Sequence, residues 1–277
     1  MRAALVVVVA LLLSAFAPGV AHAQWVGLGD SFAAGPLIPN QSLSPLGCLR
    51  SDRNFARLAA ASVGQPLTDV SCSGAKTTHM TASQSTSAGT NPPQFNALHA
   101  GVKVVSLQIG GNDIGFSEIL EKCTTYNPFG RPCRDRYTAG GTDQISARIA
   151  QAAPKVDAVL RGIRERAPGA RIIVVNYAAI VPHSGSGCWP QVPFAYSDVS
   201  YLRAKHVELN AMLAAAAAAH GAAYVDDYSA SVGRDACRSS SVRWVEPLVP
   251  GNAAAPFHPN ARGMAGIAPL VAQAAGG

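Results

Sequence analysis

Short apolar runs alternate along the chain with longer stretches of helical spacing, and both patterns predict regular elements. The run at residues 102–109 is mostly apolar, which is typical of a strand buried on both faces of a parallel sheet. Stretches with apolar residues three or four positions apart predict helices. The expected strands are 25–29, 67–70, 102–109, 171–176 and 222–226, and the expected helices are 52–62, 142–166 with a bend near Pro154, 197–220, and 260–274 capped by Asn260.

Strands that alternate with helices predict an α/β protein in which helices cover both faces of a mainly parallel, five-stranded sheet. No linker divides residues 24–277, so we expect one domain, with two smaller domains as the alternative. Ligands bind such sheets outside the carboxyl ends of the strands. Three polar or glycine-rich segments follow strand ends and are expected to face one another: 29–31, 71–74 and 110–113.

The first residues read as a secretory signal peptide rather than as part of the fold. Arg2 precedes an apolar run from Ala3 to Ala17, which is shorter than the roughly 18–20 residues needed to span a bilayer. Ala21 and Ala23 place small residues before a cleavage point. We expect residues 1–23 to be removed and the mature chain to be secreted, the alternative being an uncleaved anchor. The alanine-rich run 211–219 is expected to be a buried helix.

Charged residues make up only 14% of the chain, with a net charge of +6, which argues against a disordered or nucleic-acid-coating protein. Basic residues such as Arg161, Arg164 and Arg166 are too scattered to indicate nucleic-acid binding, and we expect them to form a solvated helix face. The positive balance weakly favours contact with an anionic lipid surface.

Six cysteines follow the predicted signal peptide, and an even number in a secreted chain implies disulfides. Sequential pairing closes the shortest loops, and we expect it on those grounds. The alternative of a metal site is weak, because the chain has no C-x-x-C pair and no His-x-x-x-His to accompany it. The expected disulfides are Cys48–Cys72, Cys123–Cys133 and Cys188–Cys237.

Four short motifs carry candidate chemistry, and each alone has an ordinary structural explanation. Ser31 in Gly-Asp-Ser follows a strand, where it is either a nucleophile near helix N–H groups or an N-cap. Asn112 in Gly-Gly-Asn-Asp offers a side-chain N–H to a developing oxyanion, or caps a turn. Gly74 lets a backbone N–H approach a substrate, and His258 in His-Pro-Asn is a general base or a surface loop histidine.

In their order and long spacings, these motifs resemble those of the SGNH (GDSL-type) hydrolases, and the signal with six cysteines resembles the secreted actinobacterial esterase and lipase branch. The resemblance covers residues 24–277 and implies a flavodoxin-like α/β/α sandwich. It implies that Ser31 is the nucleophile and His258 the general base. The N–H groups of Ser31 and Gly74 and the side chain of Asn112 would form the oxyanion hole, and Asp30 would be structural.

One position departs from the family pattern. The family often has Asp three residues before the histidine, where this chain has Ala255. The resemblance then favours orientation of His258 by a main-chain carbonyl of Ala255 or Pro256, as in some secreted members. The alternative is an acid from elsewhere, such as Asp226 or Asp227 after the fifth strand.

The resemblance implies an ester hydrolase that acts on lipid or phospholipid esters through an acyl-enzyme. We expect a monomer, and because the chain has no His-Glu-x-x-His, P-loop or Rossmann glycine motif, we expect no metal or other cofactor. A carbohydrate acetyl esterase and a non-catalytic secreted binding module are the alternatives. Transient contact with a lipid surface is expected, and contact with nucleic acid is not. Loops 123–140 and 180–197 are expected either to line an acyl groove or to pack around the disulfides with their aromatic residues, Tyr126, Phe129, Tyr137, Trp189, Phe194 and Tyr196.

Overall fold

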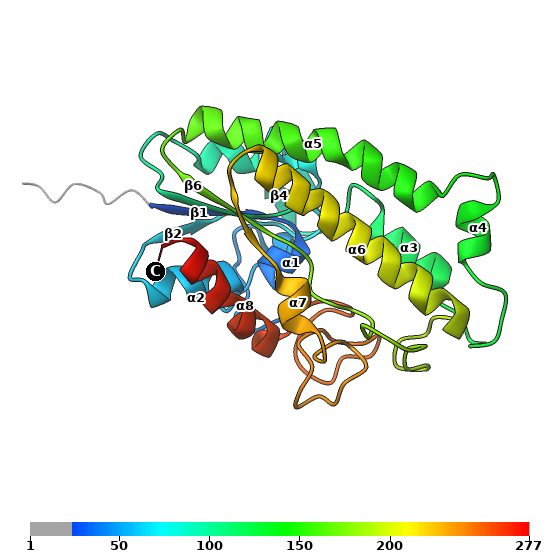
Figure 1. Cartoon of the computed structure of the whole chain (residues 1–277). Coiled ribbons are helices and arrows are strands. Elements are labelled where there is room, and N and C mark those ends of the chain that lie inside the picture. Colours follow the sequence, from blue (N-terminus) through cyan, green and yellow to red (C-terminus); the bar gives the residue numbers. More distant parts are fainter. Residues whose placement is uncertain (1–23, 277) are drawn as a thin grey trace, which may run out of the picture.

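A five-stranded parallel sheet forms the centre of the computed structural model, which describes residues 24–276. The predicted signal peptide, residues 1–23, lies outside the described residues. The strands are β1 (Trp25–Gly29), β2 (Leu67–Asp69), β5 (Val104–Gln108), β6 (Arg171–Val175) and β7 (Ala223–Val225), and a separate antiparallel hairpin consists of β3 (Gln84–Thr86) and β4 (Gly89–Asn91). The sheet order is β2-β1-β5-β6-β7, so all five predicted strands are confirmed and lie in one sheet (Figure 1).

The two central strands are buried along their whole length because both faces of the sheet are covered. Every residue of β1 and β5 is buried, and the two strands pair in register from Trp25 with Val104 to Gly29 with Gln108. The hairpin was not predicted, because its residues are polar and small and show no apolar alternation.

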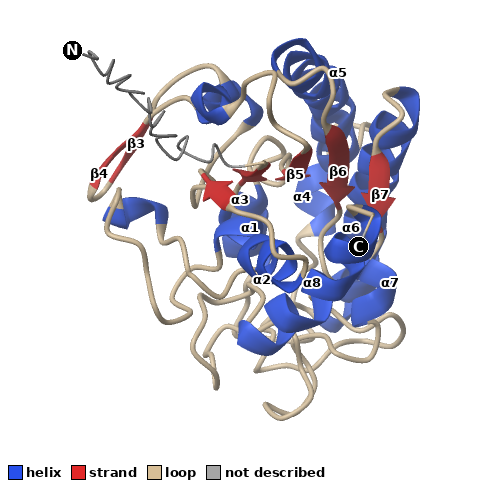
Figure 2. Cartoon of the chain, turned by 90° about the vertical axis from the view of Figure 1, so that its left-hand side faces the viewer, coloured by secondary structure: helices blue, strands red, loops and turns tan. Residues whose placement is uncertain are grey.

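Helices cover both faces of the sheet, which confirms the three-layer α/β/α arrangement (Figures 1 and 2). The helices α5 and α6 lie on one face, and α2 and α8 pack together on the other. The helices are α1 (Ser31–Ala34), α2 (Phe55–Ser62), α3 (Phe116–Cys123), α4 (Arg134–Thr138), α5 (Gln144–Arg166), α6 (Tyr196–Ala219), α7 (Asp227–Ser231) and α8 (Ala261–Ala274), with 3₁₀ turns η1 (Leu46–Cys48), η2 (Thr77–Met80) and η3 (Gln94–Ala97).

Side-chain caps fix where α2, α5 and α8 begin. Asn54 accepts from the N–H of Arg57 at the start of α2, and Asp143 accepts from the first turn of α5. Asn260 accepts from the N–H of Gly263 across 3.0 Å and caps α8, as predicted. The four predicted helices are therefore confirmed, and α2 begins later than expected because Asn54 is its cap.

The alanine-rich end of α6 is a correction to the sequence prediction. Leu209, Leu213 and Ala217 are buried four residues apart, whereas Ala211 and Ala215 are exposed. The helix belongs to an outer layer and buries only one face. Alanine is tolerated on its solvent side because it has a high helix propensity. Within residues 24–276, no helix is both long and apolar enough to cross a membrane.

Three disulfides cross-link loops and element ends, in the sequential pairing expected from the sequence. Cys48–Cys72 ties η1 to the segment that follows β2. Cys123–Cys133 closes the loop between α3 and α4. Cys188–Cys237 joins the loop before α6 to the loop after α7.

Candidate active site

The hydroxyl oxygen of Ser31 lies 2.8 Å from Nε2 of His258, at the carboxyl end of β1. β1 ends at Gly29, Asp30 caps the short helix α1 through the N–H of Phe32, and Ser31 is the first residue of that helix. Gly29 has a φ of +146°, and a Cβ there would stand 2.5 Å from the carbonyl oxygen of Gln108. Only glycine therefore allows β1 to turn so closely beside β5 and present the serine.

A backbone carbonyl orients the His258 ring. Nδ1 of His258 lies 2.7 Å from the carbonyl oxygen of Pro256, while the backbone N–H of His258 donates to the carbonyl of Ala255. Pro256, rather than Ala255, is thus the carbonyl at the ring. Burial lowers the pKa of His258 below its ordinary value of 6.5, and the hydrogen bond to Pro256 only partly offsets this.

The two acids considered as alternative partners of His258 have other surroundings. Asp226 accepts from Asn176 and caps α7 through Ser229. Asp227 is fully buried, and neither of its carboxyl oxygens has a hydrogen-bond partner within the described chain, so burial raises its pKa well above the ordinary value. Neither acid is hydrogen-bonded to His258.

Glu246 holds the histidine loop in place, a role that no motif in the sequence predicts. Its backbone pairs with the loop in both directions: Glu246 N–H donates to His258, and Phe257 N–H donates to Glu246. The buried carboxylate gathers donors from three parts of the loop: Arg243, the backbone N–H groups of Gly251 and Asn252, and the side-chain amides of Asn252 and Asn260. Although burial disfavours the charge, these hydrogen bonds lower the pKa of Glu246 to about 2.

Side-chain hydrogen bonds join the Asn112 segment to the loop that contains Gly74. The side-chain amide of Asn112 donates to the carbonyl of Ala75 across 2.9 Å, and its second amide hydrogen is left for another acceptor. Asp113 accepts from both the N–H and the hydroxyl of Thr77. Gly74 has a φ of +78°, which disfavours any other residue. Within residues 24–276, no hydrogen bond uses the N–H of Ser31 or that of Gly74.

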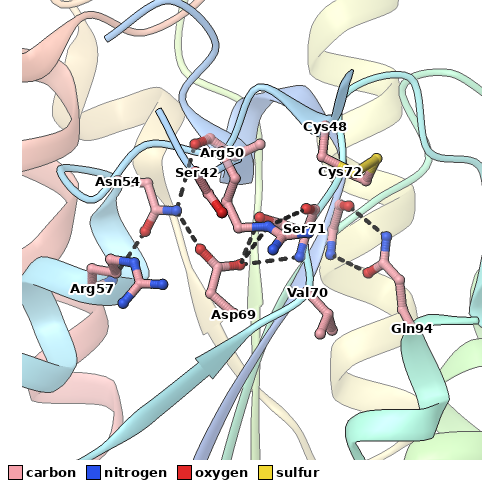
Figure 3. A network of polar contacts seen from close by, with 12 residues as sticks. Ser42, Cys48, Arg50, Asn54, Arg57, Asp69, Val70, Ser71, Cys72 and Gln94 are labelled. Atoms are coloured by element: carbon pink, nitrogen blue, oxygen red, sulfur yellow. Dashed lines mark hydrogen bonds and ion pairs between the residues drawn. A yellow bond between two sulfur atoms is a disulfide. The ribbon is translucent and has the colours of Figure 1, made fainter. Parts of the chain in front are cut away.

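A buried polar network supports this loop from behind (Figure 3). Asp69 at the end of β2 accepts from the amide of Asn54 and from both the N–H and the hydroxyl of Ser71. Arg50 donates to the carbonyl of Ser71 and lies 3.9 Å from Asp69. With the Cys48–Cys72 disulfide beside it, the network fixes the segment that leads to Gly74.

Tyr177 links three strand ends beneath Ser31. Its hydroxyl donates to Asp30 across 2.6 Å and accepts from the backbone N–H of Gly111 across 2.8 Å. Burial raises the pKa of Asp30 to about 7, against the hydrogen bonds from Tyr177 and Phe32, which lower it. Asp30 is therefore structural, as the sequence implied. Tyr177 was missed, although it directly follows the fourth predicted strand.

Comparison with known proteins decides the family. Residues 28–265 match the GDSL-like Lipase/Acylhydrolase family. The chain belongs to this family. It is 38% identical over 246 residues to Lipase 2 of Streptomyces coelicolor, covering 87% of this chain and 81% of that protein.

Two solved structures share the fold of this GDSL hydrolase over almost their whole length. Phospholipase A1 from Streptomyces albidoflavus NA297 is 25% identical, with a TM-score of 0.72 and coverage of 91% of this chain and 99% of that one. The extracellular lipase from Streptomyces rimosus is 27% identical, with a TM-score of 0.70 and coverage of 90% and 98%. The resemblance inferred from the sequence is confirmed, and the chain is a carboxylic ester hydrolase.

An apolar cavity opens beside Ser31 and Asn112 in this GDSL hydrolase, between α3, α5 and α6. Its empty space, the open mouth included, is about 730 Å³. His206 also lines it; burial lowers the pKa of this imidazole to about 4, so it is neutral near pH 7. The apolar lining consists of Phe32, Ile114, Phe116, Ile119, Leu120, Ile145, Tyr177, Ile180, Val181, Phe194, Leu202 and Leu209.

The aromatic residues of the two predicted groove loops divide between several roles. Phe194 lines the cavity. Tyr137 is buried, and Trp189 donates from its indole N–H to the carbonyl of Thr125. Tyr126 and Phe129 are exposed. In the GDSL hydrolase, α3, α5 and α6 line the cavity together with Ile180, Val181 and Phe194 of the second predicted groove loop, whereas no residue of loop 123–140 is among the lining residues.

Proposed function

We propose that the chain is a secreted serine ester hydrolase that cleaves lipid or phospholipid esters through an acyl-enzyme on Ser31. One observation carries this proposal: the Ser31–His258 hydrogen bond of 2.8 Å stands at an apolar cavity that Ser31 itself lines. A nucleophile, its base and a site for an acyl chain are therefore adjacent.

In the first half of the reaction, the hydroxyl oxygen of Ser31 attacks the ester carbonyl carbon while Nε2 of His258 takes its proton. The Pro256 carbonyl accepts the Nδ1 hydrogen and so keeps the tautomer in which Nε2 is free. The tetrahedral intermediate collapses, the bond to the alcohol oxygen breaks, and His258 returns the proton to the alcohol. Water then attacks the acyl-enzyme, His258 takes a proton from it, and the acid leaves as Ser31 regains its hydrogen.

The N–H groups of Ser31 and Gly74 and the side chain of Asn112 form the oxyanion hole in this proposal. The uncommitted N–H groups and the hydrogen bond from Asn112 to the Gly74 loop support it. Such preorganised donors stabilise the charge on the carbonyl oxygen, and loss of one typically costs about 2.7–4 kcal/mol of transition-state stabilisation.

The chemistry of the cavity supports a long acyl group over an acetyl group. An aliphatic lining of this extent stabilises a hydrocarbon chain, whereas an acetyl group needs only a small space at the nucleophile. The relatives called lipase and phospholipase A1 support the same substrate class. An acetylxylan esterase from Geobacillus stearothermophilus, 14% identical with a TM-score of 0.54, shares only the fold.

Secretion is supported by the three disulfides, which persist in oxidising compartments, and by the apolar run at the beginning of the sequence. The relative from Streptomyces rimosus is described as extracellular. Detection of the protein in the culture medium with a mature N-terminus at Gln24 tests this part of the proposal.

A series of p-nitrophenyl esters with acyl chains of increasing length tests the function. We expect kcat/KM to rise from acetyl to longer chains, and Ser31→Ala to abolish both turnover and labelling by a fluorophosphonate. A maximum at acetyl would contradict the lipid substrate while leaving ester hydrolysis standing. Labelling of the Ser31→Ala variant at the native rate would contradict the assigned nucleophile.

A further inference from the structure

Two aromatic side chains stand almost free in solvent at the tip of the loop between α3 and α4. Tyr126 is 97% exposed and Phe129 is 83% exposed. The loop is short and closed at its base by the Cys123–Cys133 disulfide. Two water-exposed aromatic rings on one short loop are typical of a surface that meets an apolar or interfacial partner.

Backbone and ring contacts hold this loop in an extended position. The N–H of Thr125 donates to the carbonyl of Pro193, and the N–H of Tyr196 donates to the carbonyl of Pro128. The ring of Phe129 meets that of Tyr196 edge-on, with centroids 5.3 Å apart. The aromatic tip is thus supported from beneath and does not fold back onto the core.

The loop rests directly on the wall of the acyl cavity. Thr124 forms an antiparallel bridge with Phe194, and Phe194 lines the cavity that also contains Ser31. A surface that received the rings of Tyr126 and Phe129 would therefore lie close to the wall of this cavity.

A small excess of positive charge lies at the base of the loop. Lys122, Arg131 and Arg136 line a hollow there, together with Asp135 and Asp198. Asp198 is buried and accepts the N–H groups of Cys133 and Arg134, and Asp135 pairs with Arg131 and Arg134. Lys122 pairs with Glu118, which Arg148 also binds. Over residues 118–136 four basic residues, Lys122, Arg131, Arg134 and Arg136, outnumber three acidic residues, Glu118, Glu121 and Asp135.

We propose that this loop docks the enzyme on an anionic phospholipid surface. Tyr126 and Phe129 enter the interface, where rings with an apolar body are favoured, and the neighbouring cations meet lipid phosphates. The charge selects a phospholipid surface over an uncharged protein patch, and the adjoining cavity wall brings Ser31 to the lipid. The use of this docking for catalysis rests on the proposed function, whereas the binding does not.

Co-sedimentation with vesicles tests the proposal. The purified protein with Ser31→Ala, which leaves the lipid intact, is mixed with vesicles of phosphatidylcholine with or without phosphatidylglycerol. We expect binding that requires phosphatidylglycerol and weakens with added salt. Tyr126→Ser with Phe129→Ser should reduce binding about tenfold or more. Lys122→Gln and Arg131→Gln should each reduce it about fivefold.

Matched control variants distinguish binding through this loop from nonspecific binding through other exposed side chains. Val207→Ser removes an exposed apolar side chain of α6 that lies about 16 Å along the helix from Tyr196. Arg161→Gln removes an exposed cation near the far end of α5. Neither should change vesicle binding. When the loop variants are made in the protein that keeps Ser31, they should hydrolyse a soluble short-chain ester at the native rate.

The outcomes distinguish this proposal from the proposed function. Native binding by the Tyr126→Ser and Phe129→Ser double variant, or equal losses in the controls, would overturn the docking loop. Self-association that depended on the two rings, without vesicle binding, would overturn it in favour of a second copy of the chain. A protein that bound vesicles through this loop but cleaved no ester would overturn the proposed function and leave the docking surface standing.

Discussion

The hydroxyl of Tyr177, the second residue after β6, donates a hydrogen bond of 2.6 Å to the carboxyl group of Asp30, the first residue after β1. The same hydroxyl accepts from Gly111, which precedes Asn112. One phenol oxygen thus sets the spacing between the segment that contains Ser31 and the segment that contains Asn112, the proposed nucleophile and a proposed oxyanion-hole donor. Neither bond touches the substrate, so Tyr177 acts as a positioning residue.

Replacement of Tyr177 by Phe should lower both stability and kcat. The N–H of Gly111 would be buried without a partner, at a cost of about 1–3 kcal/mol in the free energy of unfolding. The pKa of Asp30 should rise above about 7, because the hydrogen bond that lowers it is lost. Denaturant unfolding and steady-state kinetics measure these effects. Tyr224→Phe, which loses hydrogen bonds to Asn176 and Asn210, is the control and should leave kcat unchanged.

Removal of the His258 ring should abolish nearly all turnover, whereas loss of the rival acids should not. We expect Asp226→Asn and Asp227→Asn each to change kcat/KM little, because the hydrogen bond from Nδ1 goes to Pro256. Amidation of a true triad acid costs about 10⁴-fold in kcat. A loss of that size in either variant would show that an acid orients the ring after all.

The acidic side of the pH profile should extend below the ordinary range of histidine. His258 must be neutral to accept the proton, and burial lowers its pKa below 6.5. Activity should therefore fall only as the pH drops below 6.5, and the midpoint is read from kcat/KM. A midpoint above 6.5 would indicate a carboxylate partner that stabilises the imidazolium. Unfolding curves at the same pH values separate titration from denaturation.

Replacement of Glu246 by Gln should destabilise the protein at neutral pH and less so in acid. The folded pKa of about 2 lies below the ordinary value of 4.5. This difference is worth about 3 kcal/mol, fully present above pH 4.5 and lost as the pH falls toward 2. Urea unfolding of both proteins at pH 7 and pH 3 measures the gap. If the difference in free energy of unfolding between the two proteins were larger at pH 3 than at pH 7, the lowered pKa of Glu246 would be contradicted.

Filling the apolar cavity should shorten the preferred acyl chain. Leu202→Phe adds bulk on α6 where it lines the cavity, so kcat/KM should fall about tenfold or more for long-chain esters while acetyl ester turnover is kept. The exposed position Val207 on the same helix provides the control, Val207→Phe. Equal losses for short and long esters would mean that the cavity does not hold the acyl chain.

The framework was predictable because its residues follow simple periodic rules. The apolar run of β5 and the helical spacing of α5 specify a buried strand and a half-buried helix almost independently of context. Strand ends of a parallel sheet must meet at one edge, so the neighbourhood of Ser31 and Asn112 followed from the order of the elements.

What escaped prediction depends on contacts between distant residues. Glu246 and Arg243 are isolated charges in the sequence, and only the folded loop shows that they hold His258 in place. The choice of Pro256 over Ala255 depends on the local path of the backbone, which is not encoded by residue type. The cavity takes its walls from α3, a helix that the sequence analysis did not assign.

The hydrogen bond between Ser31 and His258 joins residues 227 positions apart, so one residue is added near the beginning of translation and the other near its end. Ser31 emerges early from the ribosome with β1, whereas its base emerges with the last segment before α8. Domains begin to fold from the N-terminal side as the chain emerges, yet the pair cannot form until residue 258 has been added. A nascent chain, or one cut short before residue 258, carries Ser31 without the imidazole that is its base in the proposed mechanism. If the proposed mechanism holds, such a chain does not attack the esters of the cell that makes it.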